Sequence, residues 1–385
     1  MKIYSPEVQH FRITTDKREK FFKYNGWPTI CKDDRGVLYT VASSMRLSHG
    51  DPCGKNCMYL SYNEGKTWTK PIVINDSFID DRDMGICYLG GGKLIVSWFT
   101  EAPANYHDQI QEWDWFDKRD QAVAWGFSEA WKLLPEGAYE GETGSFVMMS
   151  DDYGVTWSDP VRVPIAAPHG MSVCADGTLV MLGNMLYNDS YSYIDENGKE
   201  VRPPITCIAS RDGGYHWEIV GEVPNAIAPN GKEITPWEMY EPHVCEIGGG
   251  RLMGAIRVHS EHLEYLSTTM VTFSDDQGKT WSEPKYIGID GMPPHIMVHS
   301  SGAIVLSYSC RTEGVRCERA VVSYDNGETW TEDYALDHRI GYQKDMGYPS
   351  SVELDDGSIL TAYYQANVGE EWTALNCTRW RLFQK

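Results

Sequence analysis

One eight-residue pattern recurs five times along the chain and constrains its fold more than any other feature. The pattern is S-x-D-x-G-x-T-W with some variation, and its copies span residues 61–68, 150–157, 210–217, 274–281 and 323–330. Asp and Gly favour tight turns, and an Asp side chain accepts hydrogen bonds from backbone N–H groups of its own turn. We therefore expect each copy to be a turn whose Trp folds back between neighbouring strands as an apolar plug. A motif repeated in this way predicts a repeat architecture.

A second recurring feature is a short apolar run, a glycine turn and another apolar run. Six segments have this form: WPTICKDDRGVLYTVASS, MGICYLGGGKLIVSWF, GMSVCADGTLVMLGN, HVCEIGGGRLMGAIRV, HIMVHSSGAIVLSY and YPSSVELDDGSILTAYY. A D-G, G-G or S-G turn between β-rich segments indicates a hairpin. After each of the first five hairpins a further strand leads into the turn that ends in Trp. The spacings between successive Trp residues are 89, 60, 64 and 49, irregular but near the length of a four-stranded unit.

Six units of about four strands predict an all-β chain, a six-bladed β-propeller formed as one domain over residues 1–385. The sixth unit lacks the marker turn. We expect the segment EVQHFRITT, residues 7–15, to supply its missing strand and close the ring.

Residues 101–147 interrupt the second unit and are expected to form an insertion in blade 2. Within it, Gln109 to Leu134 has a helix-forming composition with apolar residues at mixed spacings of three and four. Four tryptophans of the insertion either pack on the propeller or wall a sugar site or a subunit contact: Trp113, Trp115, Trp125 and Trp131. Aromatic content alone does not decide between these roles.

Charge and composition exclude several classes of partner. The net charge of −21 opposes binding to nucleic acid or to an anionic membrane, both of which require clustered Lys and Arg. No apolar run approaches the roughly 18 residues of a membrane span, and the N-terminal residues do not have the form of a secretory signal. We therefore expect a cytoplasmic protein whose ten cysteines are free thiols. Oligomeric state is left open.

Two metal-binding interpretations are disfavoured. Cys53 and Cys57 have C-x3-C spacing, but no second Cys/His pair lies nearby to complete a zinc site. The repeated turn lacks the D-x-D-x-D-G run and the distal Glu of a calcium loop. We expect neither a metal nor another cofactor.

The repeated turn, the number of units and several spaced polar residues together resemble the sialidase (neuraminidase) superfamily, in which these turns are called Asp-boxes. The resemblance spans nearly the whole chain and implies a six-bladed propeller with exo-acting glycoside hydrolase activity. Asp-boxes are specific for the fold but weak evidence for a reaction, because other glycosidases and non-enzymatic propellers carry them. The reaction must therefore be argued from the site.

The resemblance implies three catalytic residues. Tyr348, in DMGYPSSVELDDG, matches the family's nucleophile, and a phenol with a pKa of about 10 needs a neighbouring base. Glu241, in EMYEPHVCEIGGGRL, matches that base. Asp51, in SSMRLSHGDPCGKN, matches the general acid, whose pKa must rise by partial burial. The alternative interpretation of Tyr348 and Glu241 is a packed core tyrosine and an ordinary buried ion pair.

The same resemblance implies a set of arginines that bind a substrate carboxylate. Arg257, in GAIRVHS, and Arg311, in SYSCRTEG, match two of the three, and a guanidinium fork matches a carboxylate in shape. The third belongs to an R-I-P motif, but this chain has GWPTIC and places Gly26 there. This departure puts a sialic-acid substrate in doubt.

Further polar residues match positions that contact sugar hydroxyls. Arg46 and Asp83 match a pair that grips a ring hydroxyl. Arg82, in DDRDMG, either substitutes for the missing carboxylate ligand or pairs with Asp80 or Asp81.

Four histidines lie near hairpin ends that would face one mouth: His49, His169, His243 and His295. They indicate a different sugar or a histidine-based mechanism, or they are hydrogen-bonded structural residues. We list His49 with the substrate-binding candidates.

Three functions are consistent with these observations, each with a glycan or oligosaccharide as ligand. The first is a sialidase-like exo-glycosidase that cleaves a terminal acidic sugar with retention through a tyrosyl intermediate. The second is a propeller glycosidase or lyase for another sugar, favoured by Gly26 and the additional histidines. The third is a non-catalytic carbohydrate-binding propeller.

Overall fold

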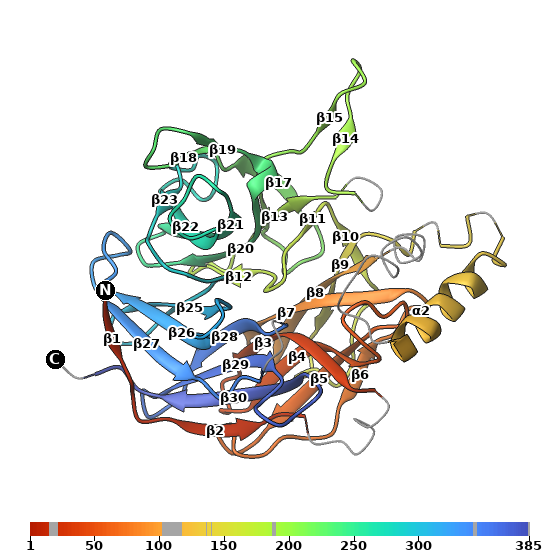
Figure 1. Cartoon of the computed structure of the whole chain (residues 1–385), viewed down its shortest axis with the longest axis horizontal. Helices are drawn as coiled ribbons and strands as arrows, with labels where there is room; N and C mark the ends of the chain where they lie inside the picture. The colour runs from red at the N-terminus through yellow and green to blue at the C-terminus, as the bar shows by residue number, and fades with distance from the viewer. Residues whose placement is uncertain are drawn as a thin grey trace.

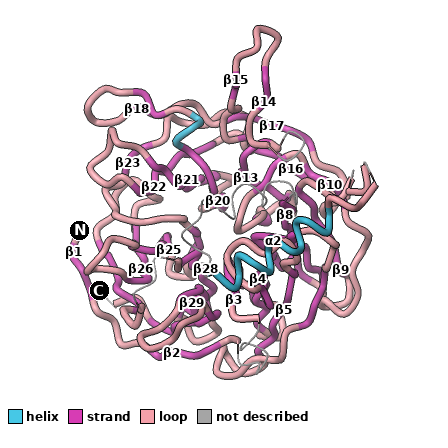
Figure 2. The backbone as a smooth tube through the Cα atoms, turned by 45° about the vertical axis from the view of Figure 1, so that its right-hand side comes forward, coloured by secondary structure: helices cyan, strands magenta, loops and turns pink. Residues whose placement is uncertain are grey.

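A computed structural model of the chain describes residues 1–14, 22–101, 118–135, 137–139, 141–186, 190–341 and 345–383. Six β-sheets are arranged around a common centre, which confirms the expected six-bladed propeller (Figures 1 and 2). In blades 1 to 5, the four main strands pair in the order of the sequence.

The first three blades occupy the N-terminal half of the chain. Blade 1 consists of β3 (Tyr24–Lys32), β4 (Leu38–Arg46), β5 (Lys55–Ser61) and β6 (Ile72–Asn75). Blade 2 consists of β7 (Asp80–Gly90), β8 (Lys93–Glu101), β9 (Ser145–Ser150) and β10 (Val161–Val163). Blade 3 consists of β12 (Ser172–Val173), β13 (Leu179–Met185), β16 (Thr206–Ser210) and β17 (Glu218–Glu222), and β11 (Ile165–Ala166) also pairs with β13.

The remaining blades follow in sequence order. Blade 4 consists of β20 (Met239–Glu246), β21 (Leu252–His259), β22 (Ser267–Ser274) and β23 (Lys285–Tyr286). Blade 5 consists of β24 (His295–Val298), β25 (Ile304–Cys310), β26 (Cys317–Ser323) and β27 (Glu332–Asp337). Blade 6 takes β28 (Gly347–Glu353), β29 (Ile359–Gln365) and β30 (Ala374–Trp380) from the C-terminal part of the chain.

The N-terminal segment contributes to two blades. β2 (Gln9–Arg12) pairs antiparallel with β30 and is the fourth strand of blade 6. β1 (Lys2–Tyr4) pairs parallel with β27 and adds a fifth strand to blade 5, which the sequence analysis did not anticipate. The two ends of the chain are thereby held by adjacent blades.

The first strands of the blades surround the centre. β3 contacts β7, β7 contacts β12, β12 contacts β20, β20 contacts β24, and β24 contacts β28. Contact between β28 and β3 closes this circle. Because all six first strands meet around one axis, residues at the same end of each strand face a shared mouth despite their distance in sequence.

The repeated turn has the same hydrogen bonds in each copy. In the fourth copy, the Ser274 hydroxyl accepts the Gly278 N–H at 2.9 Å, and the Asp276 carboxylate accepts the Thr280 N–H at 2.9 Å. The two residues at the tip, Gln277 and Gly278, both have positive φ, +63° and +87°. A glycine is needed at the second position, because a Cβ there would come within 2.7 Å of the Cys207 sulfur. The motif is therefore a structural turn between the third and fourth strands.

The tryptophan of each turn packs between blades rather than only between strands. The core is divided into six apolar clusters, one between each pair of adjacent blades. Each motif Trp belongs to the cluster between its own blade and the preceding one: Trp68, Trp157, Trp217, Trp281 and Trp330. Blade 6 has no such turn, and there Trp380 at the end of β30 joins the cluster shared with blade 5. The large side chain at the end of the motif thus fills the space between two sheets.

Short elements decorate the ring. The ribbon of β14 (Tyr193–Ile194) and β15 (Glu200–Val201) projects from blade 3 (Figure 1). A second ribbon, β18 (Ala226–Ile227) with β19 (Glu233–Ile234), and the 3-10 helix η2 (Pro236–Glu238) precede β20. The only α-helix of the described residues is α2 (Lys118–Trp131), in the expected insertion. No described helix is long and apolar enough to cross a bilayer.

The helix of the insertion is anchored by its last residue. The Trp131 indole N–H donates to the Phe78 carbonyl oxygen at 3.1 Å, and the side chain is buried. Trp131 therefore packs on the propeller, and Trp125 is half-buried. Trp113 and Trp115, with residues 109–117 of the expected helix, lie outside the described residues.

Candidate active site

Tyr348 and Glu241 meet at the centre of the ring although 107 residues separate them. The Tyr348 hydroxyl, at the start of β28, donates to Glu241 Oε1 at 2.7 Å. Arg257, on β21, binds the other carboxylate oxygen of Glu241, and its Nη1 lies 3.4 Å from the Tyr348 hydroxyl oxygen. The structure thus brings three of the expected site residues into one hydrogen-bonded group.

The surroundings of Tyr348 raise the pKa of its hydroxyl and so favour the protonated phenol. Burial raises the pKa of Tyr348 well above its ordinary value, and the negative charge of Glu241 raises it further, against the opposing effect of Arg257. The pKa of Arg257 is raised by Glu241 although burial acts in the opposite direction. A nucleophilic role for Tyr348 therefore requires proton transfer to Glu241, which the hydrogen bond already prepares.

Four first strands carry the same backbone irregularity at the mouth. Trp27, Asp83, Glu241 and Tyr348 have φ values of +55°, +50°, +47° and +50°. Each lies in a break of the strand register, on β3, β7, β20 and β28 respectively. A bulge re-aims a side chain, and positive φ at a residue other than glycine costs about 1–3 kcal/mol. Positive φ also occurs in the repeated turns, but among the described non-glycine residues only these four outliers lie in bulges of first strands, where they aim their side chains at the mouth.

Arg311 lies beside Tyr348 and has hydrogen-bond donors without partners among the described residues. It follows directly after β25, and its guanidinium carbon is 5.8 Å from the centre of the Tyr348 ring. Its Nε and Nη2 atoms are buried without a hydrogen-bond partner among the described residues. A cavity of about 370 Å³ opens here, lined in part by Tyr265, Asp290 and Met292. An anionic group entering this cavity would satisfy the guanidinium.

Asp83 shares a cavity with Glu241. The cavity has a volume of about 80 Å³, and its wall includes Asn184, Tyr191 and Tyr240. Asn184 also fixes the strand that carries Glu241, because its Oδ1 accepts the Glu241 N–H at 3.3 Å. Burial and the charge of Glu241 raise the pKa of Asp83 to about 7, against the lowering effect of Arg82.

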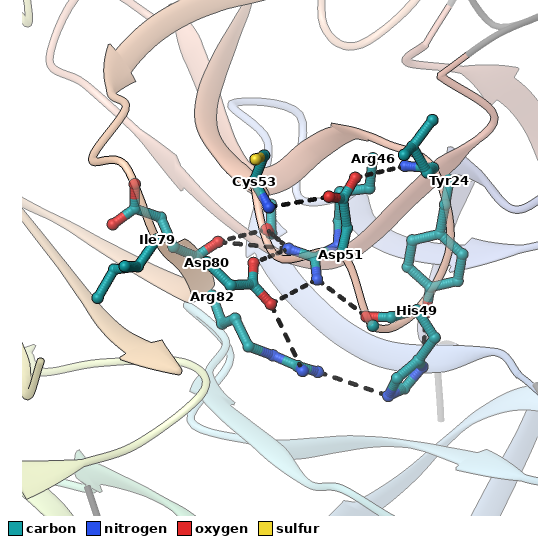
Figure 3. Close-up of polar contacts among 12 residues, drawn as sticks. Tyr24, Arg46, His49, Asp51, Cys53, Ile79, Asp80 and Arg82 are labelled. Carbon is teal, nitrogen blue, oxygen red and sulfur yellow. Dashed lines mark hydrogen bonds and ion pairs between the residues drawn. The ribbon is translucent and has the colours of Figure 1, made fainter. Parts of the chain in front are cut away.

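The Arg46 guanidinium is bound by buried groups of the protein (Figure 3). Its guanidinium binds both carboxylate oxygens of Asp80, the hydroxyl of Ser43 and the carbonyl oxygen of His49. Arg46 and Asp80 are both 0% exposed. Arg46 was expected to grip a ring hydroxyl together with Asp83, and in the structure its guanidinium is bound by Asp80. Arg46 therefore holds the loop after β4 in place.

Arg82 and His49 continue the same network toward the mouth (Figure 3). Arg82 Nη1 lies 3.7 Å from Asp80 Oδ2, and Nη2 lies 3.4 Å from His49 Nε2. His49 Nδ1 is 3.1 Å from Asp345 Oδ2. Burial acts to raise the pKa of Asp345, but His49 and the hydroxyl groups of two tyrosines lower it to about 2. His49 is thereby oriented with Nδ1 toward a carboxylate and Nε2 toward Arg82.

Asp51 lies in the loop after β4, as expected, but its carboxylate is hydrogen-bonded within that loop. One oxygen accepts the Leu47 N–H at 2.6 Å and the other accepts the Cys53 N–H at 2.9 Å (Figure 3). The side chain is 2% exposed. Burial raises the pKa of Asp51, and the nearby Arg46 charge opposes this rise.

Aromatic side chains occupy the corner where an arginine was expected from the family pattern. A Cβ added to Gly26 would lie 3.0 Å from the Tyr24 ring. Trp27 is buried next to it, and the Arg82 guanidinium carbon is 4.5 Å from the centre of the Trp27 ring. This corner therefore offers a buried aromatic wall with one arginine close to it.

The other three histidines form a buried cluster. The His243 and His295 rings stack with their centres 4.3 Å apart, and the His169 ring centre lies 5.2 Å from that of His295. The Nδ1 atom of His243 accepts the Ile296 N–H at 3.0 Å, so its proton resides on Nε2. Burial lowers the pKa of all three, to about 3 for His243. These histidines are neutral packing residues next to the site.

No group of three or more His, Cys, Asp or Glu side chains among the described residues is placed to hold a metal ion. Cys53 and Cys57 are free thiols, as are the other eight cysteines.

Several residues of the site were not found by sequence reasoning. Asp345, Tyr24 and Trp27 all contribute to the network around Arg82 and His49. Asp80 was considered only as a partner of Arg82, and its pairing with Arg46 was missed. The run DDRDMG was the one available signal, since it contained both the partner of Arg46 and the strained aspartate. The contact of His49 with Asp345 spans 296 residues and leaves no local pattern.

Comparisons with known proteins agree with this architecture. A protein of unknown function from Dyadobacter fermentans has a similar structure, with a TM-score of 0.70, 19% identity, and coverage of 98% of this chain and 99% of that one. A Hadza microbial sialidase matches with a TM-score of 0.63, 18% identity, and 94% and 67% coverage. The intramolecular trans-sialidase from Ruminococcus gnavus, solved with oseltamivir carboxylate, matches with a TM-score of 0.63, 16% identity, and 94% and 96% coverage. No curated protein sequence matches the chain.

The ring of six blades and the repeated turns define a BNR-repeat propeller, and its fold is similar to that of the two sialidases. The family model for the BNR repeat-like domain matches residues 131–360. The chain belongs to this family.

Proposed function

We propose that the protein is an exo-acting, retaining glycoside hydrolase that cleaves a terminal sugar through a covalent tyrosyl intermediate. The observation that carries this proposal is the hydrogen bond of 2.7 Å from the Tyr348 hydroxyl to Glu241 at the centre of the ring. Tyr348 attacks the anomeric carbon while Glu241 takes its proton. Tyrosine nucleophiles are an established exception to the two-carboxylate scheme of glycosidases.

The protein's arginines favour a substrate with an acidic group. Arg257 balances the charge of Glu241, and Arg311 has two buried nitrogens without partners among the described residues. An acidic group of the terminal sugar binds Arg311, whose guanidinium carbon lies 5.8 Å from the centre of the Tyr348 ring. Arg82, close to the Gly26 corner, provides the second positive charge at the mouth.

A second candidate keeps the chemistry but changes the sugar. The aromatic wall of Tyr24 and Trp27 fills the corner in which the family pattern has an arginine. A sugar without a carboxylate at this corner fits that wall better than a sialic acid does. A non-catalytic glycan-binding propeller would contain the same fold, and it is an outcome of the test below.

The test is hydrolysis of a panel of 4-methylumbelliferyl glycosides that includes a sialoside, uronides and neutral sugars. We expect the wild type to hydrolyse at least one and Tyr348→Phe to lose on the order of 10³-fold or more in kcat on it. Tyr363→Phe is the matched control, because Tyr363 is a buried tyrosine of the same blade whose hydroxyl binds Asp337 instead. Binding of glycans without turnover by the wild type would contradict the proposal, as would undiminished turnover by Tyr348→Phe.

A further inference from the structure

The proton that the leaving group needs has two candidate donors, Asp51 and Asp83. In a retaining glycosidase one carboxylic acid protonates the departing oxygen and later, as a carboxylate, deprotonates the attacking water. Both aspartates are buried near the mouth, with exposures of 2% and 6%. Their surroundings differ in ways that separate the two roles.

Asp51 is positioned to hold its loop. Each carboxylate oxygen accepts one backbone N–H, from Leu47 and from Cys53, within a stretch of seven residues. Its strongest charged neighbours are Arg46 and Asp80, which belong to the buried network behind the loop. Burial raises the pKa of Asp51, but the two backbone N–H bonds stabilise its charged form and oppose that rise, so they act against proton donation.

Asp83 stands in the setting of the two residues that carry the proposed chemistry. It shares their positive φ and their position in a bulge of a first strand. It lines the same cavity as Glu241. Its Oδ1 atom is buried without a hydrogen-bond partner among the described residues, so an oxygen is free for a ligand. Strain, a shared cavity and an unpartnered oxygen are three independent observations at one residue.

We propose that Asp83, rather than Asp51, is the acid/base residue of the reaction. This inference rests on the proposed function. In the first step the Asp83 proton moves to the glycosidic oxygen as its bond to the anomeric carbon breaks, while the Tyr348 oxygen bonds to that carbon and its proton moves to Glu241. In the second step water attacks the anomeric carbon, its proton moves to Asp83, and the Tyr348 oxygen leaves and regains the proton from Glu241.

Burial and neighbouring charges raise the pKa of Asp83, so that a large share of it is protonated near neutral pH. Burial is the largest effect, and Glu241 and Asp80 add to it, so that the pKa rises to about 7 although two arginines oppose the rise. A general acid works best with a pKa near the working pH. The charged and titratable groups around it are Arg46, Asp80, Arg82, Tyr191, Arg202, Tyr240, Glu241 and Tyr348.

The experiment compares leaving groups. Asp83→Asn is the informative variant, because asparagine tolerates positive φ and keeps the shape but cannot donate a carboxylic proton. For the sugar that the wild type hydrolyses, we expect Asp83→Asn to lose about 10²–10⁴-fold in kcat/KM on an alkyl glycoside, whose leaving oxygen must be protonated. On the 2,4-dinitrophenyl glycoside, whose leaving group needs no proton, the first step of Asp83→Asn should be slowed much less. Sodium azide should accelerate turnover by this variant, because azide attacks the intermediate in place of water.

Asp51→Asn is the matched comparison. We expect it to lower the melting temperature by loosening the loop, and to reduce turnover of the alkyl and dinitrophenyl glycosides by the same factor. If Asp83→Asn does not fold, Asp83→Glu, which retains a carboxyl group, should show a smaller loss that still falls mainly on the alkyl glycoside.

The outcomes separate this inference from the function on which it rests. A loss with Asp83→Asn that is equal for both leaving groups overturns the inference, and so does a leaving-group dependence that appears in Asp51→Asn instead. In both cases hydrolysis and the role of Tyr348 remain. Absence of hydrolysis by the wild type overturns the proposed function and this inference together.

Discussion

Two sets of repeated positions, the turns before the fourth strands and the bulges of the first strands, follow opposite rules. The turns repeat their side chains: Ser, Asp, Gly and Trp recur in nearly every copy with the same hydrogen bonds. The bulges repeat only a backbone conformation and present a different side chain in each of four blades: Trp27, Asp83, Glu241 and Tyr348. The repeated side chains of the turns stabilise the ring. The bulges, which share a backbone conformation but differ in side chain, place different functional groups at the mouth.

The largest expected effect is a loss of stability at the buried ion pair of Arg46 and Asp80, which lies behind the mouth. Arg46→Met leaves the Asp80 carboxylate buried without its main counter-charge, so we expect a loss of about 3–5 kcal/mol in the free energy of unfolding. Urea denaturation followed by tryptophan fluorescence measures it. Arg35→Met is the control, because Arg35 is half-exposed in its pair with Asp33, and it should change the midpoint little. Equal changes in both variants would show that the network does not support the mouth.

A second effect concerns acid stability and the three buried histidines. A histidine whose folded pKa is lowered stays neutral in the native state, while the unfolded chain takes up a proton below about pH 6.5. Stability is therefore lost as the pH falls below that value. With a folded pKa of about 3, His243 alone should remove about 2 kcal/mol between pH 6.5 and pH 5.

Denaturation curves at several pH values test this expectation. His243→Asn should flatten the pH dependence over that range, and His259→Asn, at an exposed position on β21, serves as control. An unchanged slope in His243→Asn would mean that the cluster is not neutral in the folded protein.

The smallest effect is expected in the repeated turns. Ser274→Ala removes the acceptor of the Gly278 N–H and a bond to Asp276, so stability should fall by about 1–2 kcal/mol. The kcat on any hydrolysed substrate should not change, since the turn lies between the outer strands of blade 4. A loss of turnover at full folding would contradict the separation of the two regions.

The sequence predicted the turns well because their interactions are local. Ser274, Asp276 and Gly278 bind one another within five residues, so the pattern of residue types carries the whole structure. The blade count followed from the hairpins for the same reason. The position of each Trp between blades was less predictable, because the partner sheet comes from the preceding repeat.

The site was predictable only where a family pattern supplied the missing geometry. Tyr348, Glu241 and Arg257 are brought together by the structure, but spacing alone says nothing about a pair 107 residues apart. The pairing of Arg46 with Asp80 shows why. The three aspartates of DDRDMG are equivalent in composition, and only the direction given by the strand and its bulge decides which one turns to the mouth.

The central claim is that Tyr348 forms a covalent bond to the sugar. Its most direct test uses a glycosyl fluoride of the hydrolysed sugar with a second fluorine next to the anomeric carbon, which slows breakdown of the intermediate. After incubation and proteolysis, mass spectrometry should find the added sugar on the peptide that contains Tyr348, and no such adduct in Tyr348→Phe. An adduct on an aspartate or glutamate, or hydrolysis by the wild type with no adduct at all, would contradict the account.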